Sequence, residues 1–99
     1  MTEVVWTNRA INDAVGIAHF ISEESVIAAE KVIYDIFYCE RLFLGDVSFD
    51  GPLYESQNKD HYYHFFIEGH YKIIYYREIE KVFIVRVFDT RQDPDKLNL

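Results

Sequence analysis

The chain has 99 residues, of which 49% are hydrophobic and 17% are aromatic. This length suits one domain, 1–99, and the apolar composition excludes an intrinsically disordered chain. The formal net charge is −7. A free-standing nucleic-acid binder generally carries a positive balance instead, because cationic side chains must neutralise the phosphates.

The chain begins with a predicted strand and a predicted helix. Residues 3–7 are rich in β-forming side chains and indicate a short strand. Thr7 or Asn8 can cap a helix that begins near Arg9. The apolar residues of this helix recur at a spacing of three and four, which predicts one buried face: Ala10, Ile11, Ala14, Ile17, Ala18 and Ile21.

A second helix is expected to follow at once. Ser22 can act as its N-cap, with Glu23 and Glu24 in the first turn, where the helix dipole favours negative charge. Gly45 is expected to end it. The acidic residues of both helices, from Asp13 to Glu40, are expected to face solvent. The apolar stripe of the second helix consists of Ala29, Val32, Ile33, Ile36, Phe37 and Phe43.

The rest of the chain predicts a loop and three strands. Residues 45–60 contain Gly, Asp, Pro and Asn without a period, which indicates a loop. Tyr, Phe, Ile and Val dominate the three runs that follow, which lie at 62–67, 71–76 and 82–88. The predicted fold class is therefore α+β: an N-terminal strand and a helical hairpin packed on an antiparallel sheet, in the order β-α-α-β-β-β.

The second hairpin predicts a definite register. A three-residue turn at 78–80 would place one apolar face of each strand against the helices. The paired residues would be Tyr71 with Val87, Ile73 with Val85 and Tyr75 with Phe83. On the opposite face, Lys72 would lie directly across from Arg86. Such a like-charge pair is mildly destabilising, which favours an anionic partner on that face or side chains that splay into solvent.

The register of the first hairpin stays open. A two-residue turn would bury Tyr62, His64 and Phe66, whereas a three-residue turn would bury Tyr63, Phe65 and Ile67. The histidines do not predict a metal site, since strand alternation places His61 and His64 on opposite faces. His64 is best interpreted as structural, with a polar contact or a general base as the alternative. No cofactor is expected.

The single cysteine and the N-terminal sequence suggest a compartment. Cys39 has no partner for a disulfide within the chain. The N-terminus lacks the basic start and apolar run of a signal peptide, and no apolar stretch approaches 18 residues. A cytoplasmic location without a membrane partner is expected.

Three stretches of the chain carry a family pattern. They are Val5–Thr7 followed by Ala10 and Ala14, then Gly69–Tyr75, and lastly Ile84–Arg91. Together they resemble the opening strand and first helix, the "G-x-Y-R-I-I-Y" strand, and the closing strand with its basic tail in the RelE/ParE superfamily of type II toxins. The resemblance implies a helical hairpin on an antiparallel sheet, a growth-inhibiting target and an antitoxin encoded by a neighbouring gene.

Two kinds of target occur in that superfamily. RelE-like members cut mRNA in the ribosomal A site, which needs proton transfer and cations for the developing phosphorane charge. ParE-like members inhibit DNA gyrase. Lys72 and Arg91 match cationic positions of the family. Tyr63 and Phe65 stand where relatives carry strand lysines, and Asp89 stands where many have a histidine. The ParE-like function is therefore favoured over an mRNA endoribonuclease.

The resemblance also suggests which residues bind the target. Lys72, Arg86 and Arg91 form the expected cationic set, which binds the target. In a nuclease, the same three residues with His64 would be catalytic. A third hypothesis is a decayed toxin that is catalytically inactive and acts only as a binding or structural protein.

A second surface is expected to bind the antitoxin. The outer sheet face would carry Ile74, Tyr76, Ile84 and Phe88, which is unusually apolar for a free face. Such a patch fits the apolar anchors of an antitoxin segment, unless residues 45–60 or the tail cover it. The chain could form a homodimer or a toxin–antitoxin hetero-oligomer.

Overall fold

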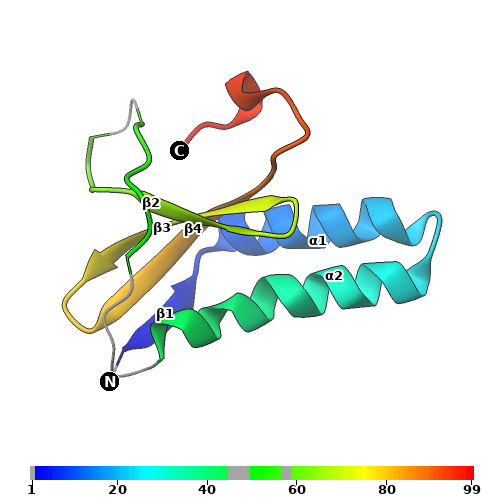
Figure 1. The fold of residues 1–99 in the computed structure, drawn as a ribbon, viewed down its shortest axis with the longest axis horizontal. Coiled ribbons are helices and arrows are strands. Elements are labelled where there is room, and N and C mark those ends of the chain that lie inside the picture. The colour runs from blue at the N-terminus through cyan, green and yellow to red at the C-terminus, as the bar shows by residue number, and fades with distance from the viewer. Residues whose placement is uncertain (1, 45–49, 57–58) are drawn as a thin grey trace.

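A computed structural model describes residues 2–44, 50–56 and 59–99. The helices and strands follow the predicted order (Figure 1), with a short 3-10 turn after the second helix and another near the C-terminus. They are β1 (Glu3–Trp6), α1 (Asn8–Ser22), α2 (Val26–Tyr38), η1 (Cys39–Phe43), β2 (His64–Glu68), β3 (Tyr71–Glu78), β4 (Lys81–Asp89) and η2 (Pro94–Lys96).

Side-chain caps fix where the two helices begin. The Thr7 hydroxyl accepts a hydrogen bond from the Ala10 amide at 3.2 Å and caps α1 as predicted. Ser25, and not Ser22, caps α2, because its hydroxyl accepts from the Ala28 amide at 3.1 Å. The Ser22 hydroxyl instead donates to the His19 carbonyl at the end of α1. The predicted N-cap of the second helix was therefore wrong by three residues.

The second helix also ends earlier than predicted. It stops at Tyr38 and continues as the 3-10 turn η1 through Phe43. Gly45, the predicted end, lies outside the described residues. The predicted apolar stripes of both helices do face the core, since Ala10, Ala14, Ala29, Ile36 and Phe43 are all buried.

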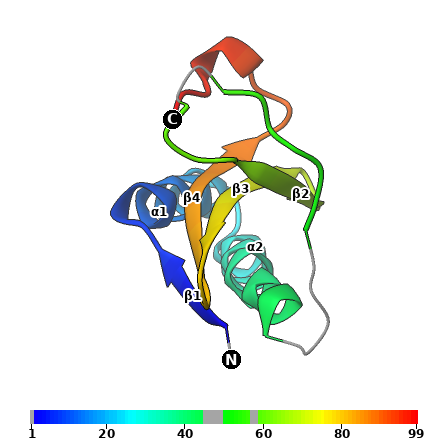
Figure 2. The same ribbon diagram turned by 90° about the vertical axis from the view of Figure 1, so that its left-hand side faces the viewer.

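The four strands form one mixed sheet in the order β1-β4-β3-β2. β3 pairs antiparallel with both β2 and β4, whereas β1 lies parallel to β4 at the edge. The helical hairpin covers one face, and the C-terminal segment lies on the side away from α2 (Figures 1 and 2). The predicted α+β architecture is confirmed, and the parallel β1 makes the sheet mixed.

The predicted register of the second hairpin was wrong. The turn contains two residues, Ile79 and Glu80, and not three. A β-bulge then leaves Val85 as an extra residue on β4, because Ile74 pairs with Arg86 while Tyr75 pairs with Ile84. The two-residue turn places Val82 and Ile84 in the core in place of the expected Phe83 and Val85, and the bulge keeps Val87 on the core face.

The first hairpin takes the two-residue turn. Gly69 occupies the left-handed region at φ 62°, which suits glycine, and Phe66 pairs with Ile73 in the core. Tyr62 is nevertheless 85% exposed, because β2 begins only at His64.

Within the described residues, no helix is long and apolar enough to cross a bilayer.

The thiol of Cys39 is fully buried beneath the sheet. Burial, with smaller contributions from Glu68 and Glu40, raises its pKa to about 12. The thiolate is the reactive form, so we expect the folded protein to react very slowly with a disulfide reagent at neutral pH. Labelling should become fast once denaturant unfolds the chain. Rapid labelling of the folded protein would contradict this placement of the side chain.

Candidate functional site

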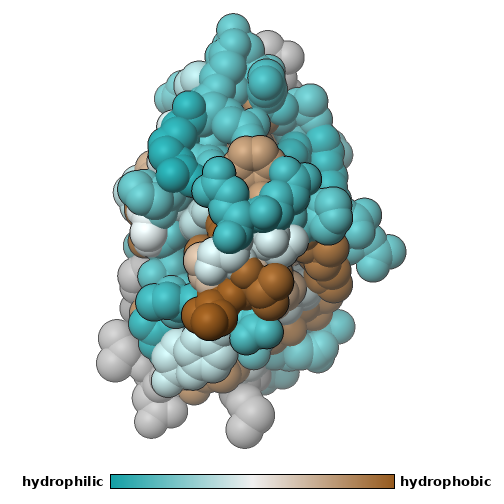
Figure 3. All heavy atoms as spheres, turned by 90° about the vertical axis from the view of Figure 1, so that its right-hand side faces the viewer, coloured by the Kyte–Doolittle hydropathy of each residue, from teal (hydrophilic) through white to brown (hydrophobic). Residues whose placement is uncertain are grey.

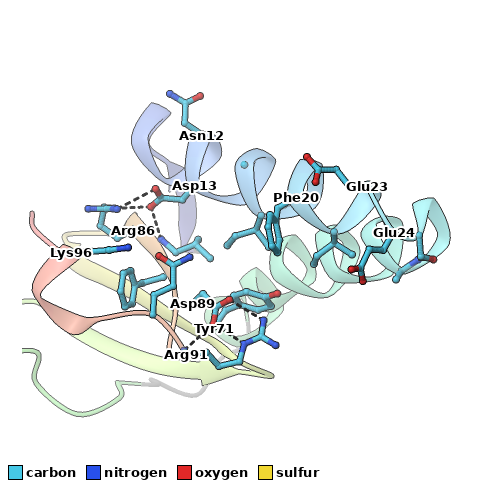
Figure 4. A pocket seen from close by; sticks show the side chains of 18 residues that line it. Asn12, Asp13, Phe20, Glu23, Glu24, Tyr71, Arg86, Asp89, Arg91 and Lys96 are labelled. Carbon is cyan, nitrogen blue, oxygen red and sulfur yellow. Dashed lines mark hydrogen bonds and ion pairs between the residues drawn. The ribbon is translucent and has the colours of Figure 1, made fainter.

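A groove of about 770 Å³ opens between α1, the turn into α2, and the end of β4 with the segment after it (Figure 4). Apolar side chains line part of it, among them Ile17, Phe20, Ile21, Ala28 and Phe88. Its polar lining includes two ion pairs, which hold two of the three cations predicted to bind the target.

The first ion pair joins Asp13 of α1 to Arg86 of β4. Asp13 accepts from Arg86 Nε at 2.7 Å and from Nη2 at 3.3 Å, and also from the Val87 amide at 3.0 Å. β1 pairs with β4 only as far as Ile84, so Asp13 takes the place of a strand partner at the uncovered edge. The expectation that Asp13 faces solvent was therefore wrong.

Arg86 also ties down the C-terminal segment. Its Nη1 donates to the carbonyl of Asn98 at 2.5 Å, and Arg9 of α1 donates to the Asn98 side chain. The Arg86 side chain is only 12% exposed. The Arg86 guanidinium of β4 thus contacts both α1 and the C-terminal segment. Arg86 therefore has a structural role in addition to any binding role.

The second ion pair lies at the exit of β4. Arg91 donates to the Asp89 carboxylate in a bidentate arrangement, from Nε at 3.0 Å and from Nη2 at 2.9 Å. Tyr71 lies beside the pair (Figure 4), and burial followed by the Asp89 charge raises the pKa of its hydroxyl. The Arg91 side chain remains 58% exposed, so this guanidinium can still reach a partner.

Lys72 lies on the other face of the sheet from the core. It pairs with Phe88, and not with Arg86, so the predicted like-charge pair was wrong. Its ammonium sits 4.8 Å from the ring centre of Phe65 and 5.6 Å from that of Tyr54, a cation–π arrangement. The sequence had left open an anionic partner or side chains that splay into solvent, and the ammonium instead contacts these two rings.

His64 is placed away from the three cations. Its Nδ1 lies 2.9 Å from the Gly51 carbonyl, and its ring stacks on Tyr75 at 5.7 Å. Because it pairs with Tyr75, it shares the helix-facing side of the sheet, whereas Lys72 is on the opposite side. The suggested nuclease set does not converge on one point. The described residues contain no group of ligands that could hold a metal ion.

The prediction that the outer face of the sheet carries an uncovered apolar patch was wrong. Ile74 and Ile84 are fully buried and Phe88 is 8% exposed. Ile84 is in the core because the turn before β4 has two residues and not three. Ile74 pairs with Phe65 on one side and with Arg86 on the other. The Phe65 amide donates a hydrogen bond to the Pro52 carbonyl of the segment before β2. Arg86 donates one to the Asn98 carbonyl of the C-terminal segment. The half-buried Tyr76 lies under the ring of His61 at 3.7 Å.

A sequence signal for Asp13 does exist. Positions 10, 13, 14 and 17 lie on one helical face, and three of them are apolar. An acidic residue within such a stripe requires a partner when the face packs. The cation that satisfies it comes from β4, 73 positions further along the chain. Arg86 reaches Asp13 from the part of β4 beyond Ile84, where β1 no longer pairs with it.

The Asp89–Arg91 pair predicts a pH dependence. The hydrogen bonds from Arg91 hold the pKa of Asp89 below its ordinary value of 3.8. A carboxyl with a lowered folded-state pKa contributes stability above its ordinary pKa and loses it as the pH falls through the lowered value. We expect carbon NMR to show Asp89 titrating below the ordinary aspartate value of 3.8. In Arg91→Ala, its midpoint should rise. An unchanged midpoint would contradict the pair.

Comparison with known proteins gives a match of fold. No family model and no curated protein matches the sequence. Among solved structures, the chain is similar to one described as "Chromosomal ParDE TA system from P. aeruginosa". The sequence identity is 16%, the TM-score is 0.67, and the match covers 90% of this chain and 96% of the other. The two helices packed on a four-stranded mixed sheet match a ParE-like toxin fold.

Proposed function

We propose that this chain is the toxin of a type II toxin–antitoxin system, that it acts in the cytoplasm, and that a cognate antitoxin neutralises it. The observation that carries the proposal is the match of fold to a ParDE structure over nearly the whole of both chains. The family pattern at Val5–Thr7, Gly69–Tyr75 and Ile84–Arg91 supports the same function from the sequence.

The groove supports antitoxin binding better than the outer sheet face does. It is open, it is partly apolar, and Phe20 is 75% exposed at its edge. A segment with apolar anchors can dock there, with Glu23 and Arg91 available for polar contacts. Of the four residues first expected to bind the antitoxin, Phe88 alone lines this groove.

We further propose a ParE-like target, DNA gyrase, in preference to ribosome-dependent cleavage of mRNA. Arg86 is held by Asp13, Lys72 by aromatic rings, and His64 is on the opposite side of the sheet from Lys72. Stabilising a phosphorane needs donors aimed together at one position, and the loss of one donor typically costs on the order of a hundredfold in rate.

Growth measurements test the toxin role. Expression of the chain alone should slow bacterial growth, and co-expression of the neighbouring gene should restore it. Normal growth with confirmed folded protein would reject the toxin role and favour a decayed toxin or a structural protein.

Primer-extension mapping of mRNA from induced cells tests the target. The proposed mechanism predicts no new cuts. Codon-phased cuts that appear on induction and vanish in Arg91→Ala would establish the nuclease instead.

A further inference from the structure

The outer face of α2 carries a row of exposed residues with coiled-coil spacing. Apolar side chains gather at the turn end of the helical hairpin (Figure 3). Along α2, Ile27 is 81% exposed, Tyr34 is 62% exposed and Tyr38 is 50% exposed, and the Lys31 side chain between them is 76% exposed. Aromatic and branched side chains in a row on a free helix face indicate a contact surface.

The spacing of this row follows the a and d positions of a heptad. The steps between successive members are three, four, three, four and three residues, which is the pattern of a helix that packs against another helix. We call the row the α2 seam, and it consists of Glu24, Ile27, Lys31, Tyr34, Tyr38 and Arg41. All six are exposed. The spacing within α2 itself runs from Ile27 to Tyr38, since Glu24 lies one residue before the N-cap Ser25, where it also lines the groove, and Arg41 lies in the 3-10 turn η1.

The α2 seam is complementary to itself when reversed. In an antiparallel pair centred between Lys31 and Tyr34, each a position meets a d position of the other copy. Ile27 then meets Tyr38, and Glu24 meets Arg41, its opposite charge. Lys31 meets the ring of Tyr34, and a contact of this kind already exists within the seam of one copy, where Arg41 lies over the ring of Tyr38 at 4.5 Å.

We propose that two copies of this chain associate through their α2 seams, antiparallel and about a two-fold axis. A second copy fits this face because the seam repeats its own pattern in reverse, with opposite charges at its two ends. A single lysine at an a position also selects a register at some cost in stability. The proposal is independent of the toxin function.

The contact is expected to be weak. α2 has 13 residues, which corresponds to a length of roughly 20 Å. One helix face of that length buries less than the roughly 800 Å² per partner of a standard interface. Association should therefore depend on concentration, and salt should weaken it through the Glu24–Arg41 pairs.

Sedimentation equilibrium over a range of concentrations tests the proposal. The average mass should rise from 11.8 kDa towards twice that value. Ile27→Glu should raise the dissociation constant about tenfold or more, because it places a charge in the seam. Ile79→Glu is the matched control, since Ile79 is 92% exposed at the β3–β4 turn and should leave association unchanged.

A charge exchange tests the antiparallel register. Glu24→Arg alone should weaken association a few-fold, and adding Arg41→Glu should restore it. A chain that stays monomeric at every concentration would overturn the proposal, as would a dimer that Ile27→Glu leaves intact. A double variant no better than Glu24→Arg would reject the antiparallel register. Circular dichroism should show every variant folded, because the substituted side chains are exposed.

Discussion

Replacing Asp13 with alanine should lower the free energy of unfolding by about 3 kcal/mol. The substitution leaves the Arg86 guanidinium, which is only 12% exposed, without its carboxylate, and it also leaves the Val87 amide without an acceptor. Removal of one member of a largely buried, hydrogen-bonded pair costs more than the pair itself contributes, since the remaining charge stays desolvated. Urea unfolding monitored by circular dichroism measures the loss.

Asp35→Ala provides the matched control. Asp35 also pairs with a cation, Lys31 at 2.9 Å, but that pair is exposed on one helix. Exposed pairs contribute little, because solvent screens the charges. The stability of Asp35→Ala should therefore stay close to that of the unmodified chain. Equal losses for the two variants would mean that Asp13 does not hold α1 to β4.

Replacing Arg91 with alanine should remove most of the growth defect while leaving the fold intact. Arg91 belongs to the predicted target-binding set, and its side chain is 58% exposed although it pairs with Asp89. The substitution also leaves the Asp89 carboxylate without its cation, so the local charge changes from neutral to negative. Colony counts after induction, at matched protein levels, measure the effect.

Lys81→Ala is the control for this loss of charge. Lys81 is exposed at the opposite end of β4, so its removal changes the net charge equally without altering the groove. Cells that express Lys81→Ala should grow as poorly as those with the unmodified chain. If Arg91→Ala stays fully toxic, Arg91 does not contact the target.

Sequence periodicity was sufficient for the helices and for the order of elements. Buried Ala10, Ala14 and Ile36 fall on the predicted stripes, since the 3.6-residue period is a local property. The N-cap of α2 was misplaced because Ser22 and Ser25 have the same capping chemistry. What selects Ser25 is the chain reversal, in which the Ile21 carbonyl accepts from both Glu24 and Ser25.

The sheet register could not be obtained in the same way. Both a two-residue and a three-residue turn are compatible with the sequence around Ile79, and a bulge at Val85 has no sequence signature here. These two local features decide which face each side chain of β4 takes. They moved Ile84 from the expected outer face into the core and separated Arg86 from Lys72.

The candidate site depends on the same features. The sequence identified Arg86 and Arg91 as important cations, and both line the groove. It did not identify their carboxylate partners, because Asp13 is remote in sequence and Asp89 was considered only as the replacement for a histidine. Which charged side chains become neighbours in the folded chain depends on tertiary packing, and the periodicity of the sequence does not predict that packing.

Supercoiling of relaxed plasmid by purified DNA gyrase is the most direct measurement of the proposed action. The purified chain should inhibit supercoiling in a dose-dependent way, Arg91→Ala should inhibit it much less, and Lys81→Ala should inhibit it as the unmodified chain does. Full supercoiling at every concentration of folded, growth-inhibiting protein would contradict the proposed target.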